Sequence, residues 1–154
     1  MTDPGDLQRI LHSAQILFLA FQDDPAPYLI PVFFGHEEGK LYVHCARWGT
    51  KIDLLGAHPQ VGFSAVADVQ IVPAEAACDF TAHAESVVGT ATASVVEEEA
   101  ERAHGLDLIM RHYAPAATAA GLRYAPAALH RTQVIALTIV EIMGKRIGGP
   151  ARQL

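Results

Sequence analysis

The apolar residues of this chain fall into short strand-like segments that follow one another in hairpin-like order rather than in βαβ alternation. We expect six strands, at Gln15–Gln22, Tyr28–His36, Leu41–Ala46, Val61–Val66, Glu85–Val96 and Thr132–Met143. Helical spacing is found instead at Leu7–His12, Thr50–Ala57 and Glu97–Tyr113. Strands joined by short connections pair antiparallel, because parallel strands need a long crossover between them. The pattern therefore predicts a mainly β (α+β) fold: an antiparallel sheet or barrel of about six strands with peripheral helices.

Two of these segments carry further information about their surroundings. Proline cannot donate to a ladder, so the strand Tyr28–His36, which contains Pro31, lies at an edge or turns that position away from a neighbour. The helix Glu97–Tyr113 begins with acidic residues and ends with basic ones, the polarity that the helix dipole favours. Its expected apolar stripe consists of Leu106, Ile109, Met110 and Tyr113. Residues 68–81 are irregular and no element is predicted for them, whereas Ala114–Pro126 is expected to be a loop or a short helical segment, and the conformation of residues 114–130 is otherwise not predicted.

Composition limits the class of protein. A chain of 154 residues, 51% of them apolar, suits one domain over residues 1–154 with a core of its own. The net charge of −6, without a basic run, argues against a nucleic-acid partner. No apolar stretch is long enough for a membrane span, and residues 1–8 do not resemble a signal peptide. The only two cysteines, Cys45 and Cys78, fit reduced thiols, so we expect a cytoplasmic protein.

The most informative stretch runs from Leu41 to Pro59, where a strand leads through a glycine-containing turn into a helix. The first turn of a helix has unpaired N–H groups and the positive end of the dipole, so it can bind an anion. Thr50 adds a hydroxyl, Lys51 adds a full charge, and Arg47 is near in sequence. The stretch therefore indicates a phosphate site, although an ordinary surface helix capped by Thr50 explains the same residues.

Side-chain nucleophiles and metal sites are not indicated. His44 and Cys45 are adjacent on one strand and point to opposite faces, so they do not form a nucleophile and base pair. Cys45 is expected to be a packed core residue. His104 and His112 are two helical turns apart, rather than the single turn of a helical metal pair, so no metal is expected.

Motifs for dinucleotide, nucleoside triphosphate, serine hydrolase and zinc protease sites are also missing from the sequence. An anion pocket without an evident nucleophile predicts a bound phosphorylated cofactor that supplies the chemistry.

Several motifs, in order, resemble the nitroimidazole-resistance family of the pyridoxamine 5′-phosphate oxidase-like, FMN-binding split β-barrel proteins. The first is YLIPVFFG at Tyr28–Gly35, and the second is LYVHCA at Leu41–Ala46. The third runs from Gly49 to Pro59 as GTKIDLLGAHP. Weaker similarities follow at Cys78, Ser86–Gly89, the acidic helix and Gly144-Lys145. The resemblance extends over about residues 7–147.

The resemblance implies an antiparallel split β-barrel that forms a homodimer, with FMN at the subunit interface. Thr50 and Lys51 would hold the phosphate, and the backbones of residues 31–33 and 44–46 would line the isoalloxazine ring and ribityl chain. Ser86 would contact the flavin from the partner subunit, and His44 would lie near its reactive region as the catalytic residue. With Arg47 added, the expected cofactor contacts are Pro31, Val32, Phe33, His44, Cys45, Ala46, Arg47, Thr50, Lys51 and Ser86.

The resemblance predicts an FMN-dependent oxidoreductase that reduces a small-molecule electron acceptor of the nitro or quinone type. A protein that binds flavin or haem without turnover is the alternative, and a purely structural dimeric domain is a third hypothesis. Thr50 stands where true pyridoxamine 5′-phosphate oxidases have an arginine, and their arginine-bearing strand motif is missing from Tyr28–Phe34. Oxidation of pyridoxamine phosphate is therefore not expected.

Overall fold

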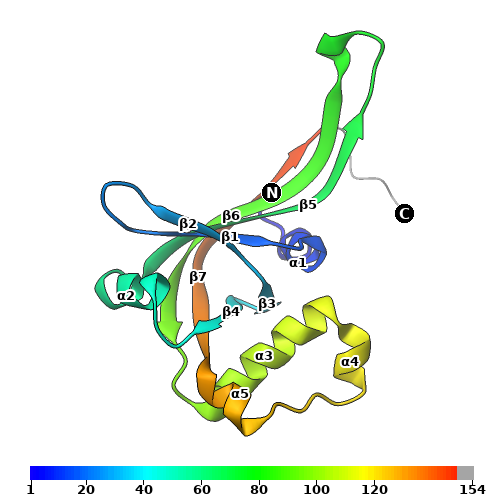
Figure 1. Ribbon diagram of the computed structural model, residues 1–154. Helices are drawn as coiled ribbons and strands as arrows, with labels where there is room; N and C mark the ends of the chain where they lie inside the picture. Colours follow the sequence, from blue (N-terminus) through cyan, green and yellow to red (C-terminus); the bar gives the residue numbers. More distant parts are fainter. Residues whose placement is uncertain (149–154) are drawn as a thin grey trace.

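The computed structural model describes residues 1–148 and consists of an antiparallel sheet with helices at its sides and ends (Figure 1). The strands are β1 (Leu17–Phe21), β2 (Tyr28–Val32), β3 (Phe34–Glu37), β4 (Lys40–Ala46), β5 (Gln60–Val72), β6 (Thr81–Val95) and β7 (Thr132–Ile147). The helices are α1 (Pro4–Ser13), α2 (Thr50–Ala57), α3 (Glu99–Tyr113), α4 (Pro115–Ala119) and α5 (Pro126–Arg131), with a 3₁₀ turn at Ala77–Asp79. The predicted mainly β fold with peripheral helices is confirmed, and none of the described helices is long and apolar enough to cross a bilayer.

The strands form one sheet in the order β2-β1-β5-β6-β7-β4-β3, and every neighbouring pair is antiparallel. The expectation of six strands was wrong, because Tyr28–His36 is two strands that break at Phe33. β2 pairs with β1 and β3 pairs with β4, so the break carries the chain from one edge of the sheet to the other. The two edge strands, β2 and β3, are joined by this connection but are not hydrogen-bonded to each other. The sheet is therefore curved but not closed. Pro31 lies in the edge strand β2, as predicted.

The middle of the chain is more regular than its sequence pattern indicates. β5 and β6 are long strands that continue past the predicted limits and form an arm that projects from the sheet (Figure 1). The segment 68–81, which has no clear period in sequence, contains the end of β5 and the tip of this arm. The ladder is interrupted between Ala67 and Gln70, where Asp68 has a φ of 53°. This irregularity breaks the period of two and hides the strand from sequence analysis.

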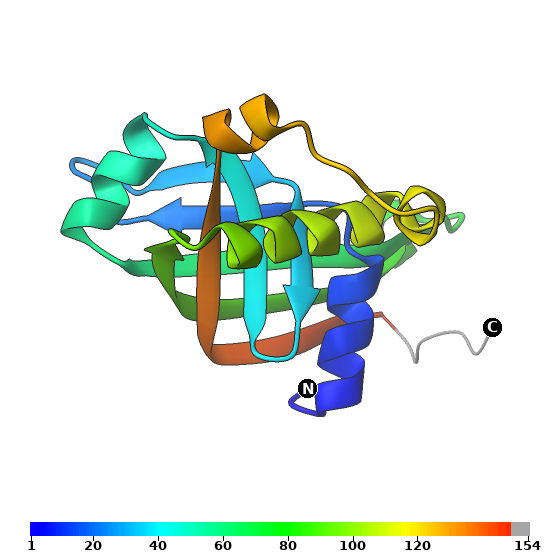
Figure 2. The same cartoon turned by 90° about the horizontal axis from the view of Figure 1, so that it is seen from below.

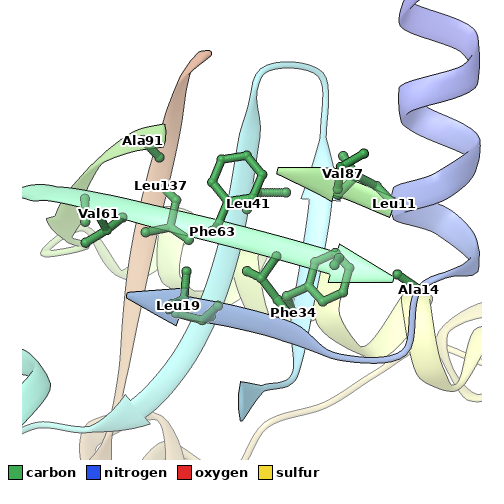
Figure 3. Packing of buried hydrophobic residues seen from close by; sticks show 14 of the residues in the cluster. Leu11, Ala14, Leu19, Phe34, Leu41, Val61, Phe63, Val87, Ala91 and Leu137 are labelled. Atoms are coloured by element: carbon green, nitrogen blue, oxygen red, sulfur yellow. The ribbon is translucent and has the colours of Figure 1, made fainter. Parts of the chain in front are cut away.

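The main core lies on the inner face of the sheet, with α1 at one end (Figure 3). Alternate residues of the strands point into it, as the period of two requires. Its fully buried larger side chains include Ile10, Leu11, Leu17, Leu19, Phe21, Phe34, Leu41 and Leu137. A smaller cluster on the other side of β4 and β7 packs against α3 and consists of Tyr42, Val96, Leu108, Val134 and Ala136. β4 and the first half of β7 are therefore buried on both faces, and their sequences are almost continuously apolar.

α3 lies across the strands and packs closely on β3 (Figure 2). A Cβ at Gly35 of β3 would come within 2.5 Å of the backbone nitrogen of Ile109, so only glycine allows this approach. The apolar stripe of this helix was partly mispredicted. Its most buried positions are Gly105, Leu108 and Ile109, whereas Leu106, Met110 and Tyr113 are half-buried. The residues of α3 that contact β3 therefore cannot be identified from the sequence period alone.

Candidate functional site

The turn between β4 and α2 has the geometry of an anion site. α2 begins at Thr50, as predicted, and Gly49 at the N-cap position has a φ of 118°, a conformation that favours glycine. No side chain caps this end of the helix. The carbonyl of Gly49 accepts from the N–H groups of Ile52 and Asp53, so the N–H groups of Thr50 and Lys51 precede the first bonds of the helix. The interpretation of Thr50 as an N-cap is therefore wrong, and the first turn remains available to a ligand.

Positive charge accompanies this helix end. Lys51 is half-buried and close enough to Cys45 for its charge to act on the thiol. The guanidinium of Arg47 is exposed and donates to the carbonyl oxygen of His130 at 3.0 Å, which ties the turn to α5. Among residues 1–148, neither Lys51 nor Arg47 forms an ion pair with a carboxylate. The turn is therefore a local basic site on an acidic protein.

Cys45 does not have the properties of a nucleophile. It packs against the main core, as the sequence predicts, while its neighbour His44 is exposed on the other face of β4. Burial raises the pKa of the Cys45 thiol, and the charge of Lys51 opposes this only in part. The thiol is therefore protonated at neutral pH.

The predicted cofactor residues gather at two places in the chain. Phe34 pairs with Val43, so Phe33, just before it, and His44, just after its partner, lie at the same end of the ladder between β3 and β4. Ala46 continues from there towards the β4–α2 turn. The exposed ring of Phe33 packs edge-on against Tyr113, with 5.0 Å between ring centroids. One end of the sheet thus unites most of the predicted contacts.

Pro31 and Ser86 lie elsewhere, on the outer face of the sheet, which is the side opposite the main core. Pro31 is opposite Phe18 in β1, and Ser86 is opposite Lys145 in β7. Val32 points inward and packs against the core, so only its backbone is open to a ligand. Within one chain Ser86 is not a neighbour of the β4–α2 turn, because β7 separates β6 from β4.

The outer face carries large apolar side chains that remain exposed, most of them on strands β1, β2, β5, β6 and β7. The exposed residues on this face are Phe18, Leu29, Val66, Val88, Val140 and Met143. A row of partners runs across it from Pro31 through Phe18, Ser64 and Val88 to Met143. A contiguous exposed apolar surface of this kind is typical of a contact with another molecule.

A second polar region, at the α1 end of the sheet, was missed by sequence analysis. The carboxylate of Glu85, whose side chain is only 6% exposed, accepts hydrogen bonds from the guanidinium groups of Arg9 and Arg146. These bonds, from Arg9 first, hold the pKa of Glu85 below its ordinary value. At the last turn of α1, His12 meets His36 of β3 and His112 of α3, and one ring nitrogen of each lies within 4.8 Å of the others. Residues so distant in sequence give no local motif, and the rejected pair of His104 and His112 contains only one of the three.

Comparison with known proteins gives a consistent result. The family described as pyridoxamine 5′-phosphate oxidase matches residues 3–146. A candidate 5-nitroimidazole antibiotic resistance protein from Bacteroides thetaiotaomicron is 26% identical, with a TM-score of 0.82 over 96% of this chain and 86% of that one. No functionally curated protein matches the chain in sequence.

Two further solved structures share the fold at lower identity. A flavocytochrome from Azotobacter vinelandii is 22% identical, with a TM-score of 0.81 over 97% of this chain and 70% of that one. An FAD and haem binding protein from Mycobacterium smegmatis is 21% identical, with a TM-score of 0.84 over 100% of this chain and 76% of that one. At this level of identity, the two show similarity of fold alone.

Proposed function

The chain belongs to the pyridoxamine 5′-phosphate oxidase family, and we propose on that premise that it binds FMN and is an oxidoreductase for a small nitro or quinone type acceptor. The observation that carries the proposal is the uncapped N-terminus of α2, whose first two residues, Thr50 and Lys51, add a hydroxyl and an ammonium group to the free backbone N–H groups. This combination suits a phosphate group. The similarity to a candidate 5-nitroimidazole resistance protein supports the class of acceptor.

The flavin itself would extend from that phosphate along the end of the β3–β4 ladder. Lys51 and the first turn of α2 would hold the phosphate, and the backbones of residues 31–33 and 44–46 would flank the ring system. Bound FMN would supply the electron transfer, which agrees with the protonated, half-buried thiol of Cys45. The chain's own residues then orient the cofactor and the acceptor. Because Thr50 replaces the arginine of true oxidases, we expect no oxidation of pyridoxamine phosphate.

We propose a symmetric homodimer in which the outer face is the subunit interface. The exposed Phe18, Val88 and Met143 need a partner to leave water, and Ser86 lies among them. Burial of this face would bring Ser86 of one subunit to the flavin of the other. In this arrangement Ser86 need not lie near the β4–α2 turn of its own chain. We expect a total interface above about 2,000 Å², as in obligate dimers. Sedimentation of a monomer at micromolar concentration contradicts this arrangement.

His44 is the proposed proton donor to the reduced acceptor. It is exposed at the same end of the ladder as Phe33, and it belongs to the backbone segment 44–46 that is proposed to line the ring. If His44 donates the proton, the rate of acceptor reduction falls as pH rises. The phosphate anchor is separate, so His44→Ala retains FMN and loses this pH dependence.

A protein that binds flavin or haem without turnover is the second candidate function. It is supported by two proteins of similar fold, one a flavocytochrome and the other an FAD and haem binding protein. The absorbance spectrum of the purified chain distinguishes the cofactors, because flavin and haem bands differ. A chain that binds neither contradicts both hypotheses.

Turnover is tested with the FMN-loaded protein by stopped-flow reoxidation with a nitroimidazole at several pH values. We expect reoxidation to be faster than that of free reduced FMN, and the pH dependence to disappear in His44→Ala. The control is His58→Ala, which removes an exposed histidine at the far end of α2. Reoxidation no faster than that of free FMN supports the binding protein instead. An unchanged pH profile in folded, flavin-loaded His44→Ala removes the catalytic role of His44.

A further inference from the structure

We propose that His12, His36 and His112 form a binding site for one divalent transition-metal ion of the Zn²⁺ class, separate from the flavin site. The three side chains come from the last turn of α1, from β3 and from the last turn of α3. Their ring centroids lie 5.8 to 6.2 Å apart, and all three pairs meet edge to face at 75° to 78°. Three imidazoles that converge from different elements make a preformed ligand set rather than a surface run of histidines.

The hydrogen bonds of two of these rings determine which nitrogen can bind a metal. The Nε2–H of His112 donates to the carbonyl oxygen of Ala14 at 2.8 Å, since a carbonyl only accepts. The lone pair of His112 is therefore on Nδ1, which is buried and has no hydrogen-bond partner within residues 1–148. Buried polar atoms without a partner are rare in folded proteins, and coordination of an ion would satisfy this nitrogen.

His36 has the same kind of support. Its Nδ1 lies 3.1 Å from Oε1 of Gln8 in α1, so Nδ1 carries the proton and Nε2 has the free lone pair. Metal-binding histidines almost always donate their other N–H to a carbonyl or carboxylate, which fixes the tautomer and the ring. Ala14 and Gln8 provide this second layer of bonds for His112 and His36.

The surroundings of His36 and His112 favour the neutral imidazole, and the pocket leaves room for an ion. Burial, with the neighbouring imidazoles, lowers the pKa of His36 to about 4, and burial also lowers the pKa of His112. Neutral imidazole is the form that binds metal. The rings line a pocket of about 140 Å³ together with Leu108 and Arg111, and Phe34 packs on His112 with ring centroids 4.8 Å apart.

The spacing and the chemistry of the three nitrogens limit the class of ion that can bind. Tetrahedral ligands with Zn–N bonds near 2.0 Å have nitrogens about 3.3 Å apart. The nitrogens here lie within 4.8 Å of one another, so binding requires them to approach further, and the exposed His12 has the most freedom to move. Three imidazoles with an open fourth position suit Zn²⁺, Co²⁺, Ni²⁺ or Cu²⁺, and do not suit Mg²⁺ or Ca²⁺, which prefer oxygen. The positive charge of Arg111 at the pocket favours an anion as the fourth ligand.

The test is a titration of the untagged, chelator-treated protein with Co²⁺ and Zn²⁺, followed by visible absorption and calorimetry. We expect one ion per chain, visible bands of tetrahedral Co²⁺, and a melting temperature that rises with Zn²⁺. His12→Ala removes an exposed ligand and should have little effect on the fold. It should weaken metal binding on the order of 100-fold, which is about one quarter of the binding free energy of a four-ligand zinc site. Gln8→Ala should weaken it roughly 10- to 100-fold without removing a ligand.

The matched control is His104→Ala, which removes an exposed histidine from the same helix, α3, and should leave metal affinity unchanged. No binding by the wild-type chain overturns the proposal, as does stoichiometric binding retained in His12→Ala. A haem absorption band that depends on His12 and replaces Co²⁺ binding also overturns it. These readouts require no flavin, so the metal site and the proposed flavin function stand or fall separately.

Discussion

Among residues 1–148, charged side chains are paired with one another at one end of the sheet and are left without ion-pair partners at the other. At the α1 end, the carboxylate of Glu85 is bonded to both Arg9 and Arg146. At the α2 end, Lys51 has no ion-pair partner among the described residues, and the first turn of α2 has no cap. A charge bonded within the chain holds the fold together, whereas a charge left unpaired beside free N–H groups is available to a ligand.

The difference follows from burial. A carboxylate as buried as that of Glu85 is stable only with charged partners, because removal from water costs several kcal/mol. The ammonium of Lys51 and the guanidinium of Arg47 are in contact with water and need no partner. The comparison therefore predicts that substitutions at the α1 end change stability, and that substitutions at the α2 end change affinity for the flavin.

The largest effect is expected for Glu85→Gln. This substitution keeps the size of the side chain but removes the charge that two arginines share, and should lower the free energy of unfolding by about 2–4 kcal/mol. Arg9 and Arg146 are partly exposed and regain water, so the loss stays below that of a fully buried pair. Urea denaturation at pH 7 measures it, with Glu38→Gln at the exposed β3–β4 turn as control. Equal losses for the two variants would show that the Glu85 bonds contribute nothing.

The next largest effect is expected for Lys51→Ala. A hydrogen bond from an ammonium group to phosphate contributes about 1.5–3 kcal/mol, so FMN affinity should fall roughly 10- to 150-fold. Stability should not change. Lys40→Ala is the matched control, because Lys40 lies at the opposite end of β4 in an exposed ion pair with Glu101. Fluorescence titration measures the affinity for FMN and for riboflavin, which has no phosphate. An equal loss of affinity for the two ligands excludes a phosphate contact by Lys51.

The sequence predicts the α2 end well because its signals are local. A strand, a glycine-containing turn and a helix that starts at Thr50 follow one another within 41–57, and the structure reproduces them with a positive φ at Gly49. The edge position of Pro31 likewise follows from one residue, since proline lacks the N–H that a central strand needs.

The α1 end could not be predicted in the same way. Arg9 and Glu85 are 76 positions apart, and His12 meets His112 only because Gly35 allows α3 to approach β3. Contacts of this kind depend on tertiary packing and leave no period or spacing in the sequence. The break at Phe33 was missed for a related reason, because both halves of Tyr28–His36 have strand composition and only their different partners separate them.

The smallest effect, and the most direct comparison of the two ends, is their response to mild acid. The pKa of Glu85 is held below its ordinary value of 4.5, so its contribution to stability is complete above that pH and is lost only as pH falls through the lowered value. The phosphate of FMN gains a proton near pH 6, which halves the charge that Lys51 meets. Between pH 7.5 and 5, unfolding by urea should therefore change little through Glu85, while FMN affinity falls about 3- to 10-fold.

Two controls identify the source of that change. Riboflavin has no phosphate to titrate, so its affinity should stay constant over the same range, and a parallel fall would point to titration of a histidine in the protein instead. Lys51→Ala should bind FMN weakly at both pH values with a smaller dependence on pH, because the group that senses the phosphate charge is gone. If the dependence in Lys51→Ala equals that of the wild type, the phosphate is held by the helix N-terminus alone, and the free charge at the α2 end has no part in binding the cofactor.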